Sequence, residues 1–107
     1  MAITKKQEAR ALSAEEHELV RKSHHPEVKN LSDGDFRQLL NLLRERRDRA
    51  RDEANRRRRE IRGKAAPKGV TSSRADEGSK LKVSVLAMAM RRLNREAQRR
   101  RNISERT

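Results

Sequence analysis

Apolar residues recur at alternating intervals of four and three residues through the middle of the chain. The positions on this pattern are Phe36, Leu40, Leu43, Ala50, Ala54 and Ile61. Arg47 and Arg57 occupy the two remaining positions of the series, and Leu39 and Leu42 widen its first half. Such spacing is typical of a seam between two packed helices. The pattern therefore predicts one long helix over residues 33–62.

A second seam with the same spacing follows near the C-terminus. Its positions are Val83, Leu86, Met90, Leu93 and Ala97. Met88 and Ala89 broaden the apolar face. The stretch KLKVSVL also alternates like a β-strand, but no second strand is predicted to pair with it. We therefore expect a helix over residues 80–101.

Two capping patterns mark helix starts in the N-terminal part. Ser13 followed by Glu16 has the spacing of a capping box, in which each side chain bonds the other residue's backbone N–H. This predicts a short helix over residues 14–22. Ser32 and Asp35 repeat the pattern immediately before the first long helix.

Two segments have the composition of flexible chain. Residues 63–79 contain three glycines, one proline and three serines, which is typical of a linker. Residues 1–12 are predicted to form a flexible N-terminus. The remainder, residues 13–107, is predicted to form a single helical module with frayed ends.

These elements predict an all-α fold built on a long antiparallel helical hairpin. Two amphipathic helices joined by a linker long enough to fold back pack most simply as an αα-hairpin. In that arrangement the small residues Ala50 and Ala54 lie opposite the bulky Leu86 and Val83. Large side chains facing small ones let the two surfaces interdigitate.

The composition limits how much this hairpin can bury. Hydrophobic residues make up 32% of the chain and charged residues 42%, so a large core is excluded. The short N-terminal helix is expected to close one end of the seam, through Leu12, Leu19 and Val20. Because so small a seam is marginally stable, a homodimer that buries two hairpins together stays an alternative.

Positive charge is concentrated in the second part of the chain. Residues 1–43 carry seven basic and seven acidic side chains, whereas residues 44–107 carry twenty-two basic and nine acidic ones. The whole net charge of +13 therefore lies in the latter segment. This asymmetry indicates a polyanionic partner, nucleic acid first and an anionic membrane surface second. A basic bias inherited from genome composition is the competing explanation.

Two arginine-rich segments carry the surplus charge. Acid–base pairs four residues apart, such as Glu45 with Arg49 and Asp52 with Arg56, explain part of the first segment as helix stabilisation. In the second segment six arginines stand against Glu96 alone, which pairing within the helix cannot neutralise. The residues predicted to contact nucleic acid are Arg56, Arg57, Arg58, Arg59, Arg62, Lys64, Arg92, Arg95, Arg99, Arg100 and Arg101.

Arginine suits such a role because its planar guanidinium can donate two hydrogen bonds to one phosphate. Clusters at opposite ends of a hairpin would follow phosphates over a helical turn of duplex. This predicts salt-sensitive binding with little sequence preference. Phe36 is the one aromatic residue, so recognition of single strands by base stacking is disfavoured. Duplex DNA or structured RNA remains as the expected ligand.

No residue pattern indicates catalysis. His17, His24 and His25 could approach a divalent cation, but adjacent histidines seldom converge on one metal, and we predict no metal site. Asp33 and Asp35 lie where a helix start favours acids. The chain has no glycine-rich phosphate loop and no nucleophile–base spacing, so we expect neither an enzyme nor a cofactor.

The absence of cysteine and of any long apolar run favours a cytoplasmic protein. An alternative function is a protein-interaction adaptor or regulator, docking through helix 14–22 with Leu39 and Leu42, or self-associating. Membrane-surface binding by the last helix is disfavoured because Met and Ala stand where Trp or Phe anchors are typical.

Overall fold

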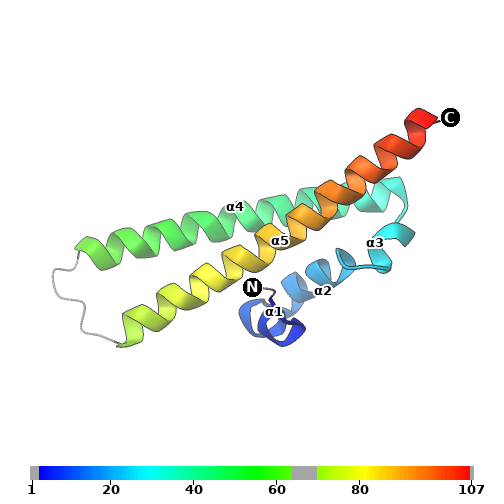
Figure 1. Ribbon diagram of the computed structural model, residues 1–107. Coiled ribbons are helices and arrows are strands. Elements are labelled where there is room, and N and C mark those ends of the chain that lie inside the picture. Colours follow the sequence, from blue (N-terminus) through cyan, green and yellow to red (C-terminus); the bar gives the residue numbers. More distant parts are fainter. Residues whose placement is uncertain (1–2, 64–69, 107) are drawn as a thin grey trace.

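The protein is an antiparallel hairpin of two long helices with a helical arm packed along one side (Figure 1). The computed structural model describes residues 3–63 and 70–106, and the side chains of residues 3–60 and 77–106. The helices are α1 (Lys5–Ala11), α2 (Ala14–Lys22), α3 (Glu27–Asn30), α4 (Asp33–Gly63) and α5 (Val70–Arg106). The predicted all-α fold and the pairing of the two long helices are confirmed.

Two side-chain contacts fix the register of α4 against α5. The guanidinium of Arg100 lies 4.5 Å from the ring centroid of Phe36. At the other end of the hairpin, Arg57 Nη1 donates to Ser79 Oγ over 2.7 Å. Both helices advance by 21 residues between these contacts, so they run side by side without slippage.

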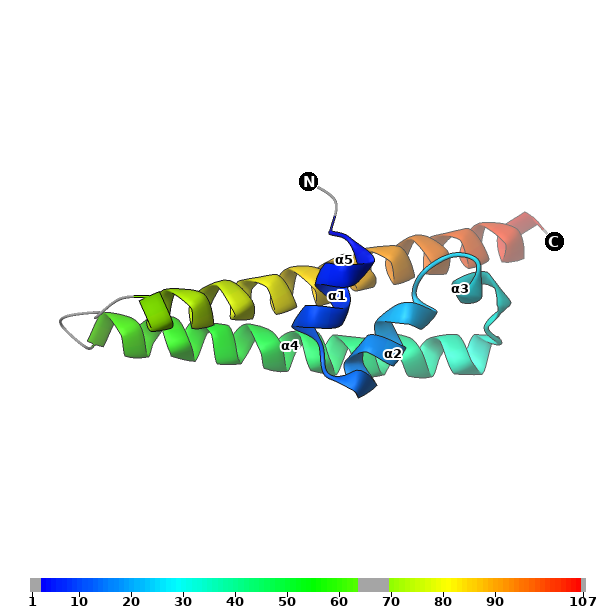
Figure 2. The same ribbon diagram turned by 90° about the horizontal axis from the view of Figure 1, so that it is seen from below.

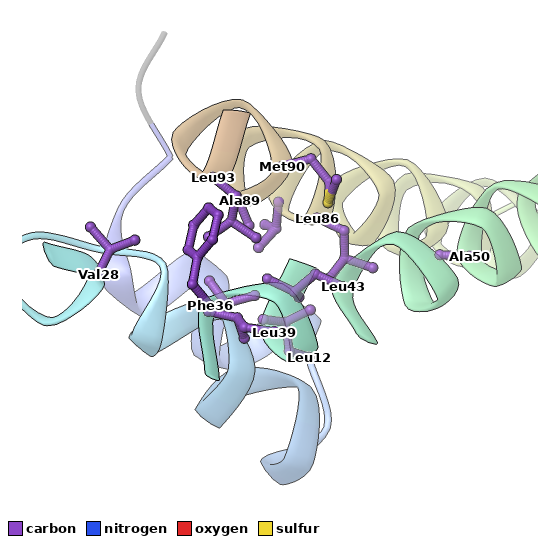
Figure 3. Close-up of a cluster of buried hydrophobic side chains, with 12 residues drawn as sticks. Leu12, Val28, Phe36, Leu39, Leu43, Ala50, Leu86, Ala89, Met90 and Leu93 are labelled. Atoms are coloured by element: carbon purple, nitrogen blue, oxygen red, sulfur yellow. The ribbon is translucent and has the colours of Figure 1, made fainter. Parts of the chain in front are cut away.

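The core is the apolar seam between α4 and α5, joined by side chains from the arm (Figure 3). Most of the predicted seam is buried, and Leu43, Leu86 and Leu93 are fully enclosed. Leu40, Val83 and Ala97 are only partly buried. The core cluster is Leu12, Val20, Val28, Phe36, Leu39, Leu43, Ala50, Val85, Leu86, Ala89, Met90 and Leu93.

The N-terminal arm, residues 3–31, covers one side of the hairpin (Figures 1 and 2). Helices α1 and α3 pack on α5, and α2 packs on α4. Val20 and Val28 are each 1% exposed, so the arm contributes to the core rather than lying loosely on it. The expected closure of the seam by Leu12 and Val20 is confirmed.

Local capping explains where two of the helices begin. In the capping box of α2, Ser13 Oγ accepts from the Glu16 N–H, and Glu16 Oε1 accepts from the Ser13 N–H. Ser32 Oγ accepts from the Asp35 N–H at the start of α4. Both predicted helix starts are therefore confirmed.

The N-terminus differs from the flexible segment expected over residues 1–12. Lys5–Ala11 forms α1, which has a capping box of its own. Thr4 Oγ1 accepts from the Gln7 N–H, while Gln7 Oε1 accepts from the Thr4 N–H. The same spacing that identified α2 was thus present here, with Gln in place of Glu.

Helix α5 is longer than the predicted helix over residues 80–101. It begins at Val70 and ends at Arg106, so the C-terminal part of the predicted linker is helical. Pro67 is the last proline of the chain, so every later residue has the backbone N–H that a helix needs. Gly78 is tolerated within the helix at a cost of about 1 kcal/mol. The rest of the predicted linker, residues 64–69, lies outside the described residues.

Candidate nucleic-acid interface

The run of four arginines at residues 56–59 is not one surface patch. Successive residues of an α-helix point about 100° apart, so four in a row face four directions. Arg57 faces α5, where it donates to Ser79. Arg56 and Arg59 lie on a different face, in a shallow hollow of mixed charge. That hollow is lined by Glu45, Arg49, Asp52, Glu53, Arg56 and Arg59. The side chain of Arg62 and all of Lys64 lie outside the described part of the chain.

The acid–base pairs predicted along α4 form only in part. Glu45 Oε1 accepts from Arg49 Nη2 at 3.3 Å, as predicted. Between residues with described side chains, no ion pair joins Asp52 to Arg56. Arg46 instead reaches across to the arm, where its Nη2 donates to Glu15 Oε1 over 2.9 Å. The charges of α4 are thus balanced partly by the arm and not by the helix alone.

Two of the C-terminal arginines, Arg92 and Arg99, are held by partners within the protein. Arg92 Nε and Nη2 donate to Ser23 Oγ over 3.1 and 3.0 Å, and burial lowers the pKa of Arg92. Arg99 forms a two-bond pair with Glu96. Side chains held in this way are poor candidates for phosphate contacts. Arg95 and Arg101 are exposed, and Arg101 donates to Gln98 over 2.7 Å.

Arg100 has the most complete set of partners among these arginines. Its Nε donates to Glu96 Oε2 over 2.7 Å and its Nη1 to Asp33 Oδ1 over 2.8 Å. Its Nη2 donates to the carbonyl oxygens of Val28 and Leu31 over 3.1 and 2.8 Å. Glu96 alone could not neutralise this segment, but acceptors from the N-terminal half of the chain supply what the helix lacks.

Three buried carboxylates were missed as a group. Glu8, Glu16 and Glu96 are each at most 5% exposed. Burial alone would raise the pKa of Glu16, but hydrogen bonds from Ser13 and Lys82 more than offset it, and the pKa is lowered. Hydrogen bonds from the two neighbouring guanidinium groups lower the pKa of Glu96 to about 2. Glu8 and Glu16 lie on the arm and pair with Arg92 and Lys82 of α5. Glu96 acts indirectly, because it holds Arg100, which donates to two carbonyl oxygens of the arm.

The histidines join the same arm contact. His24 Nε2 lies 2.7 Å from Glu8 Oε1, and Arg92 Nη2 lies 3.9 Å from the same oxygen. His17 and His25 line the surface hollow next to this pair. No group of three or more His, Cys, Asp or Glu within the described residues is arranged to hold a metal ion.

The hairpin has two flanks, one on each side of its seam, and the arm covers one of them. On this covered flank, Leu39 is buried and Arg46 pairs with the arm. The α5 side of the covered flank carries Lys82, whose Nζ lies 3.2 Å from Glu16 Oε1, and the buried Glu96. Its charges are therefore neutralised within the protein.

The opposite flank carries a regular row of arginines on α4. Its members, called the arginine row below, are Arg37, Arg44, Arg51 and Arg58. Each follows a seam position by one residue, and the seven-residue interval keeps them on the same side of the seam, although on a straight helix the row drifts by about 20° per heptad. All four are exposed. No ion pair or hydrogen bond joins any of them to a residue whose side chain is described.

The neighbouring positions of α5 do not neutralise the arginine row. In an antiparallel pair, the residues that follow the seam positions of α5 lie on the same flank as those that follow the seam positions of α4. On α5 these are Ser84, Ala87, Arg91, Asn94 and Gln98, together with Lys80 and Arg101, which follow the α5 residues that contact Arg57 and Phe36. None is a carboxylate, although opposite charges commonly face each other at such positions. Asp48 lies four residues after Arg44 and three before Arg51, but it pairs with Arg47 at 3.2 Å.

The arginine row is the feature that sequence reasoning missed. The run at residues 56–59 is conspicuous because its arginines are adjacent, yet adjacency separates side chains around a helix. Only Arg58 belongs to both groups. The signal that could have found the row is the period of seven, read in phase with the seam.

The two leucines suggested for a protein partner differ in exposure. Leu39 is 4% exposed and belongs to the core cluster, whereas Leu42 is 38% exposed. An apolar docking surface built on both leucines is therefore not present. No helix in the described part of the chain is long and apolar enough to cross a membrane.

Comparison with protein families, with curated proteins and with solved structures gave no match.

Proposed function

We propose that this protein binds nucleic acid, duplex DNA or structured RNA, through arginine–phosphate contacts along the uncovered flank of the hairpin. The supporting observation is the arginine row. Four exposed cations lie on one face of α4, and the facing positions of α5 supply no carboxylate. Like charges brought side by side repel each other, and a polyanion would relieve that repulsion.

The contrast between the two flanks strengthens this proposal. The covered flank also carries Arg46 and Lys82, but each has an acidic partner on the arm. Where the fold needs cations neutralised, the chain supplies carboxylates. Among the residues whose side chains the structure describes, the arginine row has none, although Glu and Asp are common elsewhere in α4. Other exposed arginines, such as Arg56 and Arg95, lie on other faces, but those on this flank of α4 form a regular row.

Contacts of this kind are made to the nucleic-acid backbone and carry little sequence information. Affinity should therefore depend strongly on salt and weakly on base sequence. The proposal makes the protein a cytoplasmic nucleic-acid-associated factor whose seam and arm hold the arginine row in place.

The test is the affinity for a duplex of about 20 base pairs, measured by fluorescence anisotropy between roughly 50 and 200 mM salt. Four phosphate contacts predict that log K falls against log salt with a slope of about −4. A second duplex of scrambled sequence should bind equally well. An affinity that does not change with salt would reject the proposal.

A further inference from the structure

The geometry of the arginine row points to the form of its ligand. We infer that the uncovered flank is a site for one turn of a double helix, about ten base pairs, bound lengthwise along α4. This inference rests on the proposed function and adds the length of the bound duplex and its orientation along α4.

The row is long and rigid. Arg37 and Arg58 are 21 residues apart on the uninterrupted helix α4. At about 1.5 Å per residue, they are separated by about 32 Å, with one arginine every ~10 Å. Helix α5 runs beside this whole stretch in constant register (Figure 1). The cations therefore form a stiff, nearly linear array along one side of the hairpin.

The length of this array matches a double helix. One turn of duplex is about 34–36 Å long, close to the length of the row. A straight line along a duplex meets the same strand again after one turn. Arg37 and Arg58 can therefore reach equivalent phosphates one turn apart, while Arg44 and Arg51 contact the backbone between them.

A single strand fits the same array less well. A duplex is stiff far beyond this length, with a persistence length of about 150 base pairs, so it needs no ordering to match a straight array. A single strand must be ordered, and the proteins that bind it recover this cost by stacking bases on aromatic rings. The one aromatic residue here, Phe36, is 7% exposed and lies beneath the Arg100 guanidinium. The site therefore favours duplex.

The experiment measures how the loss of Arg58, at one end of the row, changes the affinity for duplexes of two lengths. A duplex of about 12 base pairs spans all four arginines, whereas a stem of about six base pairs, roughly 20 Å long, spans three at most. The variant Arg58→Gln should bind the longer duplex roughly eightfold more weakly at about 0.1 M salt, the value of a single arginine–phosphate pair. It should bind the short stem within about twofold of the unmodified protein, because the stem can use the other three arginines.

The matched control is Arg56→Gln, which removes the same charge from another face of the same helical turn. It should leave both affinities within about twofold. DNA and RNA duplexes are tested in parallel, and tight binding of either supports the shared phosphate chemistry while identifying the source. A single strand of about 12 nucleotides without self-pairing should bind at least about tenfold more weakly than the duplex.

Two outcomes would overturn the inference while leaving the proposed function intact. One is an equal loss with Arg58→Gln at both lengths, and the other is a single strand that binds as tightly as duplex. Both would leave salt-dependent binding at the arginine row. The absence of any salt-dependent binding would instead reject the proposed function itself.

Discussion

Two double substitutions on α4, each removing two positive charges, can show whether duplex binding depends on the position of the arginines or only on the total charge. Arg51→Gln with Arg58→Gln removes half of the arginine row. Arg56→Gln with Arg59→Gln removes two arginines from the mixed-charge hollow on another face. All four residues are exposed, and Gln has nearly the helix propensity of Arg, so both variants should fold normally.

The expected difference follows from how many phosphates each variant can still neutralise. Each neutralised phosphate adds about 0.9 to the slope of log K against log salt, which amounts to roughly eightfold in affinity at about 0.1 M salt relative to 1 M. The variant in the row should therefore bind a duplex of about 20 base pairs about sixtyfold more weakly at this salt concentration. Its slope should fall by about 1.8. The control variant should stay within about threefold.

Fluorescence anisotropy at several salt concentrations measures both quantities, and circular dichroism confirms equal helix content. Equal losses in the two variants would mean that total charge alone determines binding and would refute the argument from position. A larger loss in the control would restore the arginine run as the contact surface.

Two further predictions concern how the arm is held. Because the folded-state pKa of Glu96 is about 2, below its ordinary value of 4.5, its contribution to stability is complete above about pH 4.5 and is lost as pH falls towards 2. The free energy of unfolding should fall by on the order of 3 kcal/mol more over this range than in Glu96→Gln; parallel pH profiles in urea titrations would contradict the assignment. Ser23 is fully buried and accepts from Arg92, so Ser23→Ala should lower the free energy of unfolding by about 1–3 kcal/mol. The exposed control Ser84→Ala should change it by less than about 0.5 kcal/mol, and an equally small effect at Ser23 would show that the buried bond is dispensable.

Much of the fold could be predicted because its signals are local or periodic. The alternating spacing identified both long helices, and the Ser13–Glu16 pair placed the start of α2 correctly. Helix α1 was missed although Thr4 and Gln7 carry the same signal, because Gln stands where Glu is the more familiar partner. The extent of α5 was missed because serines and glycines weaken the helical signal of its first turns. These turns continue the part of α5 that packs on α4.

The candidate site was harder to predict because its charges are neutralised over long distances in the sequence. Arg100 meets Asp33 across 67 residues and the Val28 carbonyl across 72. No local pattern shows which arginines will find such partners. Once the contacts of α4 with the arm and with α5 are known, the arginines that these contacts do not use can be identified. Four of them form the arginine row.

The most direct test of this account is to observe the arginine side chains themselves while duplex is added. The Nε–Hε resonances of the protein can be followed by ¹H–¹⁵N NMR during titration with a duplex of about one helical turn. The account predicts that the signals of Arg37, Arg44, Arg51 and Arg58 shift together, while those of Arg56 and Arg92 stay in place. Shifts confined to Arg56 and its neighbours in the run, with the row unchanged, would contradict it.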